Sequence, residues 1–597
     1  MSANSSPIKS HRYNLGLIGN CAFNALIDTN ANIKWMCWPR FDSSFIFGSL
    51  LDDDKGGEFS IQPATDSFKS SQSYIENTNI LSTRFESSDG SFEVIDFAPR
   101  FDFAGATHRP LMLLRKVKRL SGQPRIAVKC RPVGDYGKIV PERLLEQNQI
   151  RFEGLGESVS LISSAYVANN VFNENAFELK EDLCLVLSYG TSFEGPLEST
   201  FEDLLNRTEK HWHLWIKSSR LPGVFQKDVI RSALTLKLHQ YEETGATIAS
   251  VTTSLPEIDQ EGRNWDYRFC WMRDTYYTLA ALKELGYTDE MKRYAGFIKK
   301  LENTESGSLQ PCYRIDATAK MTEIIEDLRG YKNNQPVRVG NQAGSQIQHD
   351  VYGQVLLSLL GLQTDSRETD SVVALAKNLL NSIERTMEEP DNGVWEFRGK
   401  QSMHTYTLMF HWAGGVAAKK IAESIKDSEL AIRADKIVTQ AASLIEGSYS
   451  PTKKAYAQAV GSDEMDACML QLISMGYLDG KNPEVTSKHL EAIRKELEIS
   501  PGFLLRYKHT DDFGVQRSAF LVCSFWYIEA LAHMGRADEA KALLEKVIAT
   551  QNHVGLMSED YDVENDSQWG NFPQTYSHAG LISCAFTIDR AMNTRTE

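Results

Sequence analysis

The stretch "SFEGPLES", residues 192–199, separates two halves of the chain that have different hydrophobic periods. Before it, short apolar runs often alternate with polar residues and are interrupted by Gly, Asn, Asp and Pro, as in "SFEVIDFAP" and "LCLVLSYG". After it, apolar residues recur at the three- and four-residue spacing of amphipathic helices. The stretch therefore marks a change from a β-rich region to a helical region.

The first half is predicted to be an antiparallel β-sandwich that covers residues 1–197, because many short strands at close spacing are typical of that architecture. A segment rich in charged and aromatic residues follows over 198–224, and it is predicted to be a helical linker. At 597 residues the chain is longer than one hydrophobic core usually supports, which agrees with more than one domain.

The second half, residues 225–597, contains twelve candidate helices identified by apolar spacing and by end signals such as Gly286 and Gly476. Twelve helices joined by mostly short turns fit a solenoid or a closed ring of six hairpins, and the lack of a fixed-length repeat weakens the solenoid. The predicted helices lie near 225–242, 272–286, 288–303, 349–363, 367–388, 403–424, 427–447, 462–475, 485–497, 518–535, 537–551 and 574–593.

Composition excludes several classes of protein. A net charge of −15 without a basic run argues against a nucleic-acid partner, because phosphate binding needs a basic surface. No stretch has the roughly 18 apolar residues of a membrane span, and the N-terminus lacks the apolar core of a signal peptide. Nine dispersed cysteines without CxxC spacing predict reduced thiols, and we therefore expect a cytoplasmic protein.

Motifs for other chemistries are missing or fail on spacing. The sequence has no GxSxG, no GxGxxG after a strand and no GxxxxGK[ST]. In "HWHLW", His211 and His213 are two residues apart, which places them on different faces of a helix. The acidic run from Asp560 resembles a calcium loop, but Asn565 stands where Gly is needed and Asn571 where Glu is needed. We therefore predict no metal and no cofactor.

Numbered in order along the chain, the predicted helices 2, 4, 6, 10 and 12 are each preceded by a cluster of polar residues. In a ring of helical hairpins alternate helices run in the same direction, so these clusters should meet at one end of the ring. Chance would have scattered them over both ends. The clusters are "RNWDYRFCWMRD" (263–274), "NQAGSQIQHD" (341–350), "VWEFRGKQSMH" (394–404), "LLRYKHTDDFGVQR" (504–517) and "SEDYDVENDSQWGNFPQ" (558–574).

Together these clusters have the residue types of a sugar-binding pocket. Aromatic rings stack on the apolar faces of a pyranose, and Asp and Arg side chains bond its hydroxyl groups. Hydrolysis of a glycosidic bond also needs two carboxyl groups, one to protonate the leaving oxygen and one acting on the other side of the sugar. The candidates are Trp265, Trp271, Trp395 and Tyr576 as aromatic residues, and Arg273, Asp274, Glu396, Arg506 and Glu559 as polar ones.

Glu396 also has a simpler interpretation. A glutamate near the start of a helix is stabilised by the helix dipole without any function, and Arg398 offers it a surface partner. The Trp-rich block likewise could be a structural cluster in which an Arg–Asp pair caps a helix.

At this point the sequence resembles glycoside hydrolase family 15, the glucoamylase-like enzymes. The resemblance runs from "IGNCAFNALID" (18–28) and "WPRFDSSFIFGSLL" (38–51) to "GNFPQTYSHAGLI" (570–582), and its most specific block is "RNWDYRFCWMRD". It implies a β-sandwich followed by an (α/α)6 barrel. It also implies hydrolysis with inversion at the anomeric carbon, water being the nucleophile.

Matching motif to motif, the resemblance assigns roles to individual residues. Glu396 of "VWE" falls at the general acid and Glu559 of "SEDYD" at the general base. Arg273 and Asp274 match the pair that holds the terminal glucose, and Arg506 matches a further sugar-binding arginine. Tyr576, Trp395 and Trp265 are expected to be aromatic substrate-binding residues.

Departures from the family pattern lie on the leaving-group side: Phe397 follows the acid where fungal members have Glu, Leu408 replaces a lysine of one bacterial branch, and "QRSAF" (516–520) lacks a Glu-Gly pair. The expected function is inverting, exo-acting hydrolysis of short α-glucans that releases β-glucose, with trehalase activity as the alternative. A phosphorylase and a silent carbohydrate-binding protein are less favoured. The expected partner is an α-linked gluco-oligosaccharide or disaccharide, and a homo-oligomer is allowed.

Overall fold

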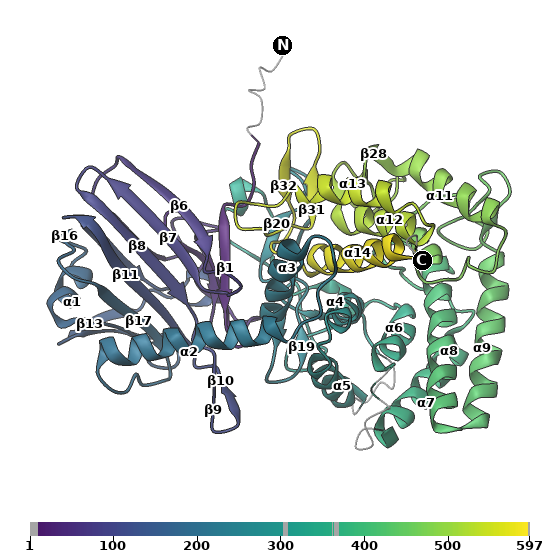
Figure 1. The fold of residues 1–597 in the computed structure, drawn as a ribbon, viewed down its shortest axis with the longest axis horizontal. Coiled ribbons are helices and arrows are strands. Elements are labelled where there is room, and N and C mark those ends of the chain that lie inside the picture. Colours follow the sequence, from purple (N-terminus) through teal and green to yellow (C-terminus); the bar gives the residue numbers. More distant parts are fainter. Residues whose placement is uncertain (1–9, 303–308, 361, 363–368, 595–597) are drawn as a thin grey trace, which may run out of the picture.

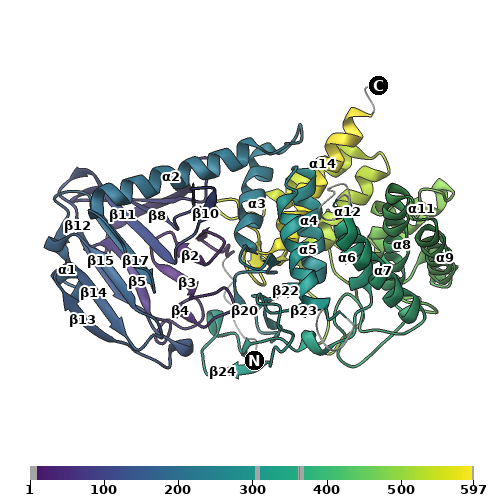
Figure 2. The ribbon, with the colours of Figure 1, turned by 90° about the horizontal axis from the view of Figure 1, so that it is seen from below.

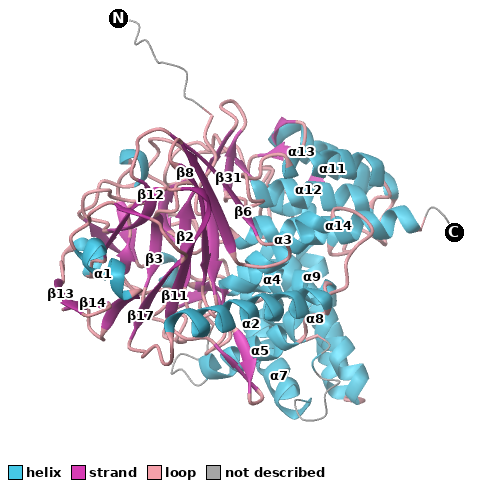
Figure 3. Cartoon of the chain, turned by 60° about the vertical axis from the view of Figure 1, so that its left-hand side comes forward, coloured by secondary structure: helices cyan, strands magenta, loops and turns pink. Residues whose placement is uncertain are grey.

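The computed structural model describes residues 10–302, 309–360, 362 and 369–594, and it divides them into a β-rich region and a helical region (Figures 1 and 3). All strand pairs are antiparallel within the largest sheet of the β-rich region. This sheet has the order β13 (Glu142–Glu146), β14 (Gln149–Glu153), β15 (Val159–Ser163), β17 (Leu183–Tyr189), β11 (Met112–Gly122), β8 (Gly90–Phe97), β7 (Leu81–Ser87) and β6 (Phe68–Tyr74).

Two smaller antiparallel sheets complete this region, and an isolated bridge between Asn32 and Ser60 links them. One has the order β1 (Leu15–Gly19), β2 (Asn24–Asp28), β3 (Ile33–Cys37) and β4 (Phe45–Phe47). The other has the order β16 (Phe177–Glu178), β12 (Arg125–Arg131) and β5 (Glu58–Pro63). A hairpin of β9 (Phe101–Phe103) with β10 (Ala106–His108) and the helix α1 (Ala165–Phe172) lie outside these sheets.

A buried ion pair connects the large sheet to the smaller ones. Arg115 of β11 is fully buried and donates to Asp96 of β8 at 2.7 Å. The same guanidinium donates to the carbonyl group of Phe59 in β5 and to that of Ala31 in the turn between β2 and β3. Since a buried charge needs partners for all its donors, Arg115 fixes how the sheets face each other.

The helix α2 (Leu197–Lys217) lies beside the β-rich region and runs toward the helical region (Figure 1). Its His211 contacts Asp102 at 3.1 Å, while the carbonyl of Trp215 accepts the hydroxyl of Tyr287 at 2.8 Å. His213, the other histidine of the "HWHLW" motif, contacts the carbonyl of Glu76, so each of the two imidazoles has its own local partner. The two histidines thus serve packing around α2.

The helical region contains twelve α-helices within the described residues, and all but α10 have bounds close to those of a predicted helix. Their bounds are α3 (Gln226–His239), α4 (Met272–Glu284), α5 (Asp289–Glu302), α6 (Asp350–Leu359), α7 (Thr369–Thr386), α8 (Thr405–Ile425), α9 (Ser428–Glu446), α10 (Gln471–Ser474), α11 (Pro483–Leu497), α12 (Leu521–His533), α13 (Ala537–Ile548) and α14 (Thr575–Asn593). Residues 303, 361, 363, 367 and 368 of the predicted helices lie outside the described residues.

The prediction of one long helix over 462–475 was wrong. Asp466 accepts the backbone N–H of Cys468, and a 3-10 turn, η5 (Ala467–Leu470), precedes the single α-helical turn of α10. Gly476, at a φ of +80°, ends the element. The side chain of Asp466 therefore competes for the backbone at the position where a longer helix would begin.

Every second helix belongs to a closed inner ring. α4 packs on α6, α6 on α8, α8 on η5, α10 on α12, α12 on α14, and α14 returns to α4. The helices α6 and α8 approach so closely that a Cβ on Gly353 would lie 1.9 Å from the carbonyl oxygen of Phe410. Closure excludes the solenoid, and it brings the loops before the inner helices to one end of the ring (Figure 2).

Ion pairs connect the β-rich region to the helical region. Arg40 contacts Asp316 at 2.9 Å, and Arg314 contacts Asp42 at 2.6 Å. Among the described residues, no helix is long and apolar enough to cross a membrane.

Candidate active site

One pocket contains all nine residues that were predicted from the sequence to line it, although they are separated by up to 311 positions. They are Trp265, Trp271, Arg273, Asp274, Trp395, Glu396, Arg506, Glu559 and Tyr576. These residues lie in the first turns of the helices α4 and α14 or in the loops that precede α4, α8, α12 and α14. Arg506, in the loop before α12, follows the strand β29 (Phe503–Leu504). The space between the lining atoms is about 820 Å³, counting the part open to solvent.

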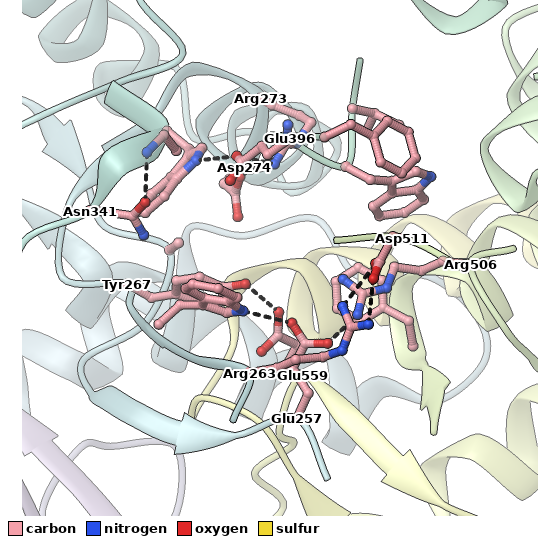
Figure 4. Close-up of a pocket in the computed structure, with 18 of the residues that line it drawn as sticks. Glu257, Arg263, Tyr267, Arg273, Asp274, Asn341, Glu396, Arg506, Asp511 and Glu559 are labelled. Carbon is pink, nitrogen blue, oxygen red and sulfur yellow. Dashed lines mark hydrogen bonds and ion pairs between the residues drawn. The ribbon is translucent and has the colours of Figure 1, made fainter. Parts of the chain in front are cut away.

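Glu396 is held by two donors on a single oxygen. The indole N–H of Trp271 donates to its Oε1 at 2.7 Å, and Nη2 of Arg273 lies 3.2 Å from the same atom. The side chain is 23 % exposed, and Figure 4 shows it at the edge of the pocket interior. Arg398 is not its partner, so Glu396 is not the solvated surface acid of the simpler interpretation.

The backbone around Glu396 is unusual. Glu396 has a φ of +63°, a left-handed conformation that is uncommon for a residue other than glycine. Its loop is tied down by Asp391, which accepts the N–H groups of His349 and Gly393, and by Asn392, whose amide donates to the carbonyl of Phe397. The local fold therefore directs this carboxyl group into the pocket at the cost of backbone strain.

Arg273 and Asp274 begin the inner helix α4 and are buried beside Glu396. Arg273 donates to the hydroxyl of Tyr576 at 2.6 Å and to Oε1 of Gln348 at 3.2 Å, which fixes its guanidinium plane. Burial raises the pKa of Asp274 to about 7, against the attraction of Arg273. This part of the pocket offers fixed donors and one carboxyl group, a set that suits sugar hydroxyl groups.

Glu559 lies on the other side of the pocket from Glu396 (Figure 4). The hydroxyl of Tyr267 donates to its Oε1 at 2.7 Å. Burial raises the pKa of Glu559 well above its ordinary value, and the neighbouring carboxyl groups of Asp560 and Glu257 add to this effect. The hydrogen bond from Tyr267 and the charge of Arg506 act in the opposite direction.

Two other carboxyl groups lie close to Glu559. Asp560 is its neighbour in the sequence. In the structure Glu257, which stands in a loop more than 300 residues earlier, also faces it. Because like charges repel in a buried site, ionisation of Glu559 depends on the arginines and the tyrosine around it.

Two arginine–carboxylate pairs brace the next part of the wall. Arg506 forms an ion pair with Glu257, whose other oxygen accepts the indole N–H of Trp265 at 3.0 Å. Arg263 binds Asp511 through both terminal nitrogens, at 2.6 and 2.9 Å. The two-point contact of Arg263 with Asp511 holds both of these side chains in a fixed orientation.

Trp395 is also a lining residue, but its polar atom faces away from the acid. Its indole N–H donates to Asp466 at 2.8 Å, and its ring packs against Phe520 and Trp526. The tryptophan that contacts Glu396 through its N–H is Trp271, which the sequence analysis named only as an aromatic lining residue.

Sequence reasoning missed Tyr267 and Glu257. Tyr267 lies within the block "RNWDYRFCWMRD", so the signal was present and only the direction of its side chain was unknown. Glu257 stands in "SLPEIDQ", where nothing in the sequence separates it from an ordinary loop carboxylate. It becomes visible through its ion pair with Arg506.

The arrangement can perform acid–base chemistry on a bound sugar. Glu396 and Glu559 lie on opposite sides of a pocket that hydrogen-bond donors, aromatic rings and further carboxyl groups also line. Among the described residues no cluster of side chains suits a metal ion.

Comparison with known proteins supports this assignment. The sequence pattern of the glycosyl hydrolases family 15 matches residues 223–586, and a trehalase-like N-terminal pattern matches residues 3–212. The chain is 31% identical to a trehalase of Thermoplasma volcanium, with 97% of this chain and 94% of that protein covered. It is 33% identical to trehalase 1 of Sulfolobus acidocaldarius, with 95% and 97% covered.

A bacterial glucoamylase complexed with acarbose has the same fold, with a TM-score of 0.68 at 15% identity over 98% of this chain and 96% of that one. Family patterns that cover most of the chain, and relatives that match it from end to end, agree with the pocket geometry. The chain belongs to the glycosyl hydrolases of family 15 and is a glycoside hydrolase.

Proposed function

We propose that the protein is an inverting trehalase that hydrolyses α,α-trehalose to two molecules of glucose. The observation that carries this proposal is the similarity over nearly the whole chain to proteins named trehalase, at 31% and 33% identity. From the sequence alone, short α-glucans are the expected substrates and trehalose is the alternative. These relatives reverse that order, because the glucoamylase resembles this chain in fold at only 15% identity.

In the proposed mechanism Glu396 is the general acid. Trp271 and Arg273 both donate to Oε1, so in the acid form Oε1 is the carbonyl oxygen and the proton belongs on Oε2. That proton passes to the bridging oxygen of trehalose as the bond from C1 to this oxygen breaks. The leaving glucose departs as a neutral alcohol.

Glu559 is the proposed general base. It takes a proton from a water molecule, whose oxygen attacks C1 of the retained glucose from the face opposite the leaving group. Tyr267 holds the carboxylate through Oε1, and Oε2, which accepts a 3.4 Å hydrogen bond from the backbone N–H of Asn571, keeps a second lone pair for the water. One bond to oxygen forms and one breaks, and each carboxyl group changes its protonation state once. Inversion converts the α-linked retained sugar to β-glucose.

Arg273, Asp274 and Tyr576 are the proposed binding residues for the retained glucose, and Arg506, Trp265 and Trp395 for the leaving side. We also propose three units along the chain: a β-sandwich at 1–197, a helical linker at 198–224 and an (α/α)6 barrel at 225–597. The end of β17 at Tyr189 and the start of α3 at Gln226 support these limits.

Proton NMR of the first products tests the proposal. Inversion of trehalose yields one β-glucose and one α-glucose, so both anomers should appear in equal amounts before mutarotation. Two α-glucose molecules would mean retention and would exclude Glu559 as a base. A panel of trehalose, maltose, isomaltose and maltotriose, each with and without phosphate, separates a trehalase from a glucoamylase-type enzyme, a phosphorylase and an inactive binding protein.

A further inference from the structure

Two loops meet at the open side of the active-site pocket and form a wall there. The wall consists of Phe397 and Arg398, which follow Glu396, and of Asp511, Asp512 and Phe513, which precede α12; all five line the pocket. We call these five residues the mouth wall. Its two halves are joined by a hydrogen bond from the backbone N–H of Arg398 to Oδ2 of Asp512 at 2.7 Å.

The side chain of Arg398 contacts two aromatic rings across the mouth of the pocket. Its guanidinium carbon lies 5.2 Å from the ring centre of Phe513 and 5.0 Å from that of Trp265. Phe513 and Trp265 contact each other edge to face, with ring centres 4.9 Å apart. Cation–π and edge-to-face contacts of this kind are each favourable. The mouth wall therefore reaches across to the Trp-rich loop before α4.

Arg398 is held from a third side as well. Its Nη2 lies 3.4 Å from Glu323, which also pairs with Arg338 at 3.4 Å, and Arg338 stacks on Trp265 at 4.6 Å. Loops before α4, α6, α8 and α12 thus converge on one guanidinium group. This arrangement orders a long arginine side chain that would otherwise be mobile in solvent.

The half of the wall before α12 is anchored to the pocket interior. Asp511 binds Arg263 through both oxygens and accepts the N–H of Phe513 at 2.8 Å, which makes residues 511–514 a tight turn. Burial would raise the pKa of Asp511, but the hydrogen bonds from Arg263 and Tyr507 lower it to about 2. The anchor therefore keeps its charge, and its ion pair, throughout the neutral range.

A second hollow lies directly behind the mouth wall. It is lined by Gly399, Lys400, Gln458, Gly461 and His509, together with residues of the wall itself, and it is open to solvent. Phe397, Asp511 and Asp512 line both spaces. The wall is therefore a single layer of side chains between the active-site pocket and a groove with room for another sugar.

We propose that the mouth wall ends the leaving-sugar side of the pocket after one glucose unit and thereby limits the substrate to a disaccharide. This inference rests on the proposed function and adds its size limit. An enzyme that trims glucan chains must let the rest of the chain leave past the second sugar. Here Arg398 and Phe513, which line the pocket but not the outer groove, stand on that path, and a smaller side chain at either position would leave room for a third sugar at the mouth.

The test compares trehalose with glucosyl-trehalose, in which a third glucose is α-1,4-linked to one ring. When the unsubstituted ring occupies the retained-sugar side, the third glucose points toward the mouth wall, and cleavage gives glucose and maltose. We expect the wild-type protein to discriminate strongly against this substrate in kcat/KM. In Arg398→Ala and Phe513→Ala the discrimination should fall about tenfold or more, since one steric mismatch commonly changes selectivity by that amount.

Lys400→Ala is the matched control, because it removes a cation from the same loop but lines only the outer groove. Its selectivity should equal that of the wild type. The size limit is overturned if the wild type cleaves both substrates equally well, or if the wall variants lose activity on both in the same proportion. Arg398 is on the surface, so its variant remains informative if Phe513→Ala does not fold.

Failure of the size limit can be told apart from failure of the trehalase proposal. If the wild type does not hydrolyse trehalose but cleaves maltose, the trehalase proposal is wrong. The ratio of kcat/KM for maltose to that for maltotriose, measured in the same variants, then tests the mouth wall. Product analysis prevents confusion between the two bonds of glucosyl-trehalose. Maltose marks cleavage of the trehalose bond, whereas trehalose marks removal of the terminal glucose.

Discussion

The hydroxyl of Tyr267 donates a hydrogen bond to Oε1 of Glu559 at 2.7 Å, and the buried Glu559 has two further carboxyl groups, those of Asp560 and Glu257, beside it. Tyr267 belongs to the loop before the first inner helix and Glu559 to the loop before the last one. The bond therefore crosses the point where the ring of helices closes. It is one of the two interactions that oppose the raised pKa of Glu559.

Replacing Tyr267 with Phe should lower kcat/KM and move its acidic limb to higher pH. A hydrogen bond to the charged form favours ionisation, so losing it raises the pKa of Glu559 further. Hydrogen bonds to charged groups contribute about 1.5–3 kcal/mol, which corresponds to a loss of roughly ten- to a hundredfold at fixed pH. A pH profile of kcat/KM measures both effects. An unchanged acidic limb would show that Tyr267 does not act on the base.

Replacing Asp560 with Asn should have the opposite effect on the acidic limb. Asp560 is fully buried next to Glu559, and its negative charge raises the pKa of that residue. Removing a like charge makes ionisation easier, so the acidic limb should move to lower pH, while Ser518 can still bond the amide oxygen. Asp562→Asn is the control, because Asp562 caps its own turn through Glu564 and Asn565. A shift to higher pH in Asp560→Asn would contradict this account.

How much could be predicted from the sequence differs between the ring and the pocket. The helices were visible because an inner helix such as α12 is apolar on all sides and its neighbour α13 on one side only. That the polar clusters lie at one end of the ring followed only from the fact that alternate helices run in the same direction. The length of α10 was overestimated because the spacing of apolar residues does not show that the Asp466 side chain accepts the backbone N–H of Cys468.

Within the site, residue types were predictable but orientations were not. Glu396, Glu559, Arg273 and Asp274 stand in motifs, and the fold brings them together. The hydrogen bond of Trp271 to Glu396 and the ion pair of Glu257 with Arg506 join loops over 120 residues apart. Such partners depend on the closed ring, which no local pattern encodes. Arg398 shows the same limit, since it lies two residues from Glu396 yet pairs with other loops.

The loop that carries Glu396 should depend strongly on Asp391. This buried carboxyl group accepts the N–H groups of His349 and Gly393 and the hydroxyl of Thr407, at 2.8 to 3.0 Å. Asp391→Ala leaves three donors without this acceptor, each at a cost of about 1–3 kcal/mol, and releases the strained backbone at Glu396. We expect a lower urea midpoint and a fall in kcat that exceeds any change in KM.

Thr407→Val is the graded control for Asp391, because it removes only one of the three donors. It should cost about 1 kcal/mol and leave kcat near that of the wild type. If Asp391→Ala loses stability but keeps full kcat, the loop does not need this anchor to present Glu396. A positioning role would then be excluded, and a purely structural one would remain.

The proposed division of roles between the two carboxyl groups predicts different responses to the leaving group. Glu396→Gln cannot donate a proton, so hydrolysis of trehalose should fall by about 10²–10⁴-fold, the usual contribution of general acid catalysis. α-Glucosyl fluoride needs little protonation of its leaving group, and it should recover most of that loss. Glu559→Gln removes activation of the attacking water, which both substrates share, so neither should be rescued. Steady-state rates on the two substrates decide the assignment. If Glu559→Gln regains activity with α-glucosyl fluoride and Glu396→Gln does not, the two roles are reversed. The two donors on Oε1 of Glu396 would then hold the general base.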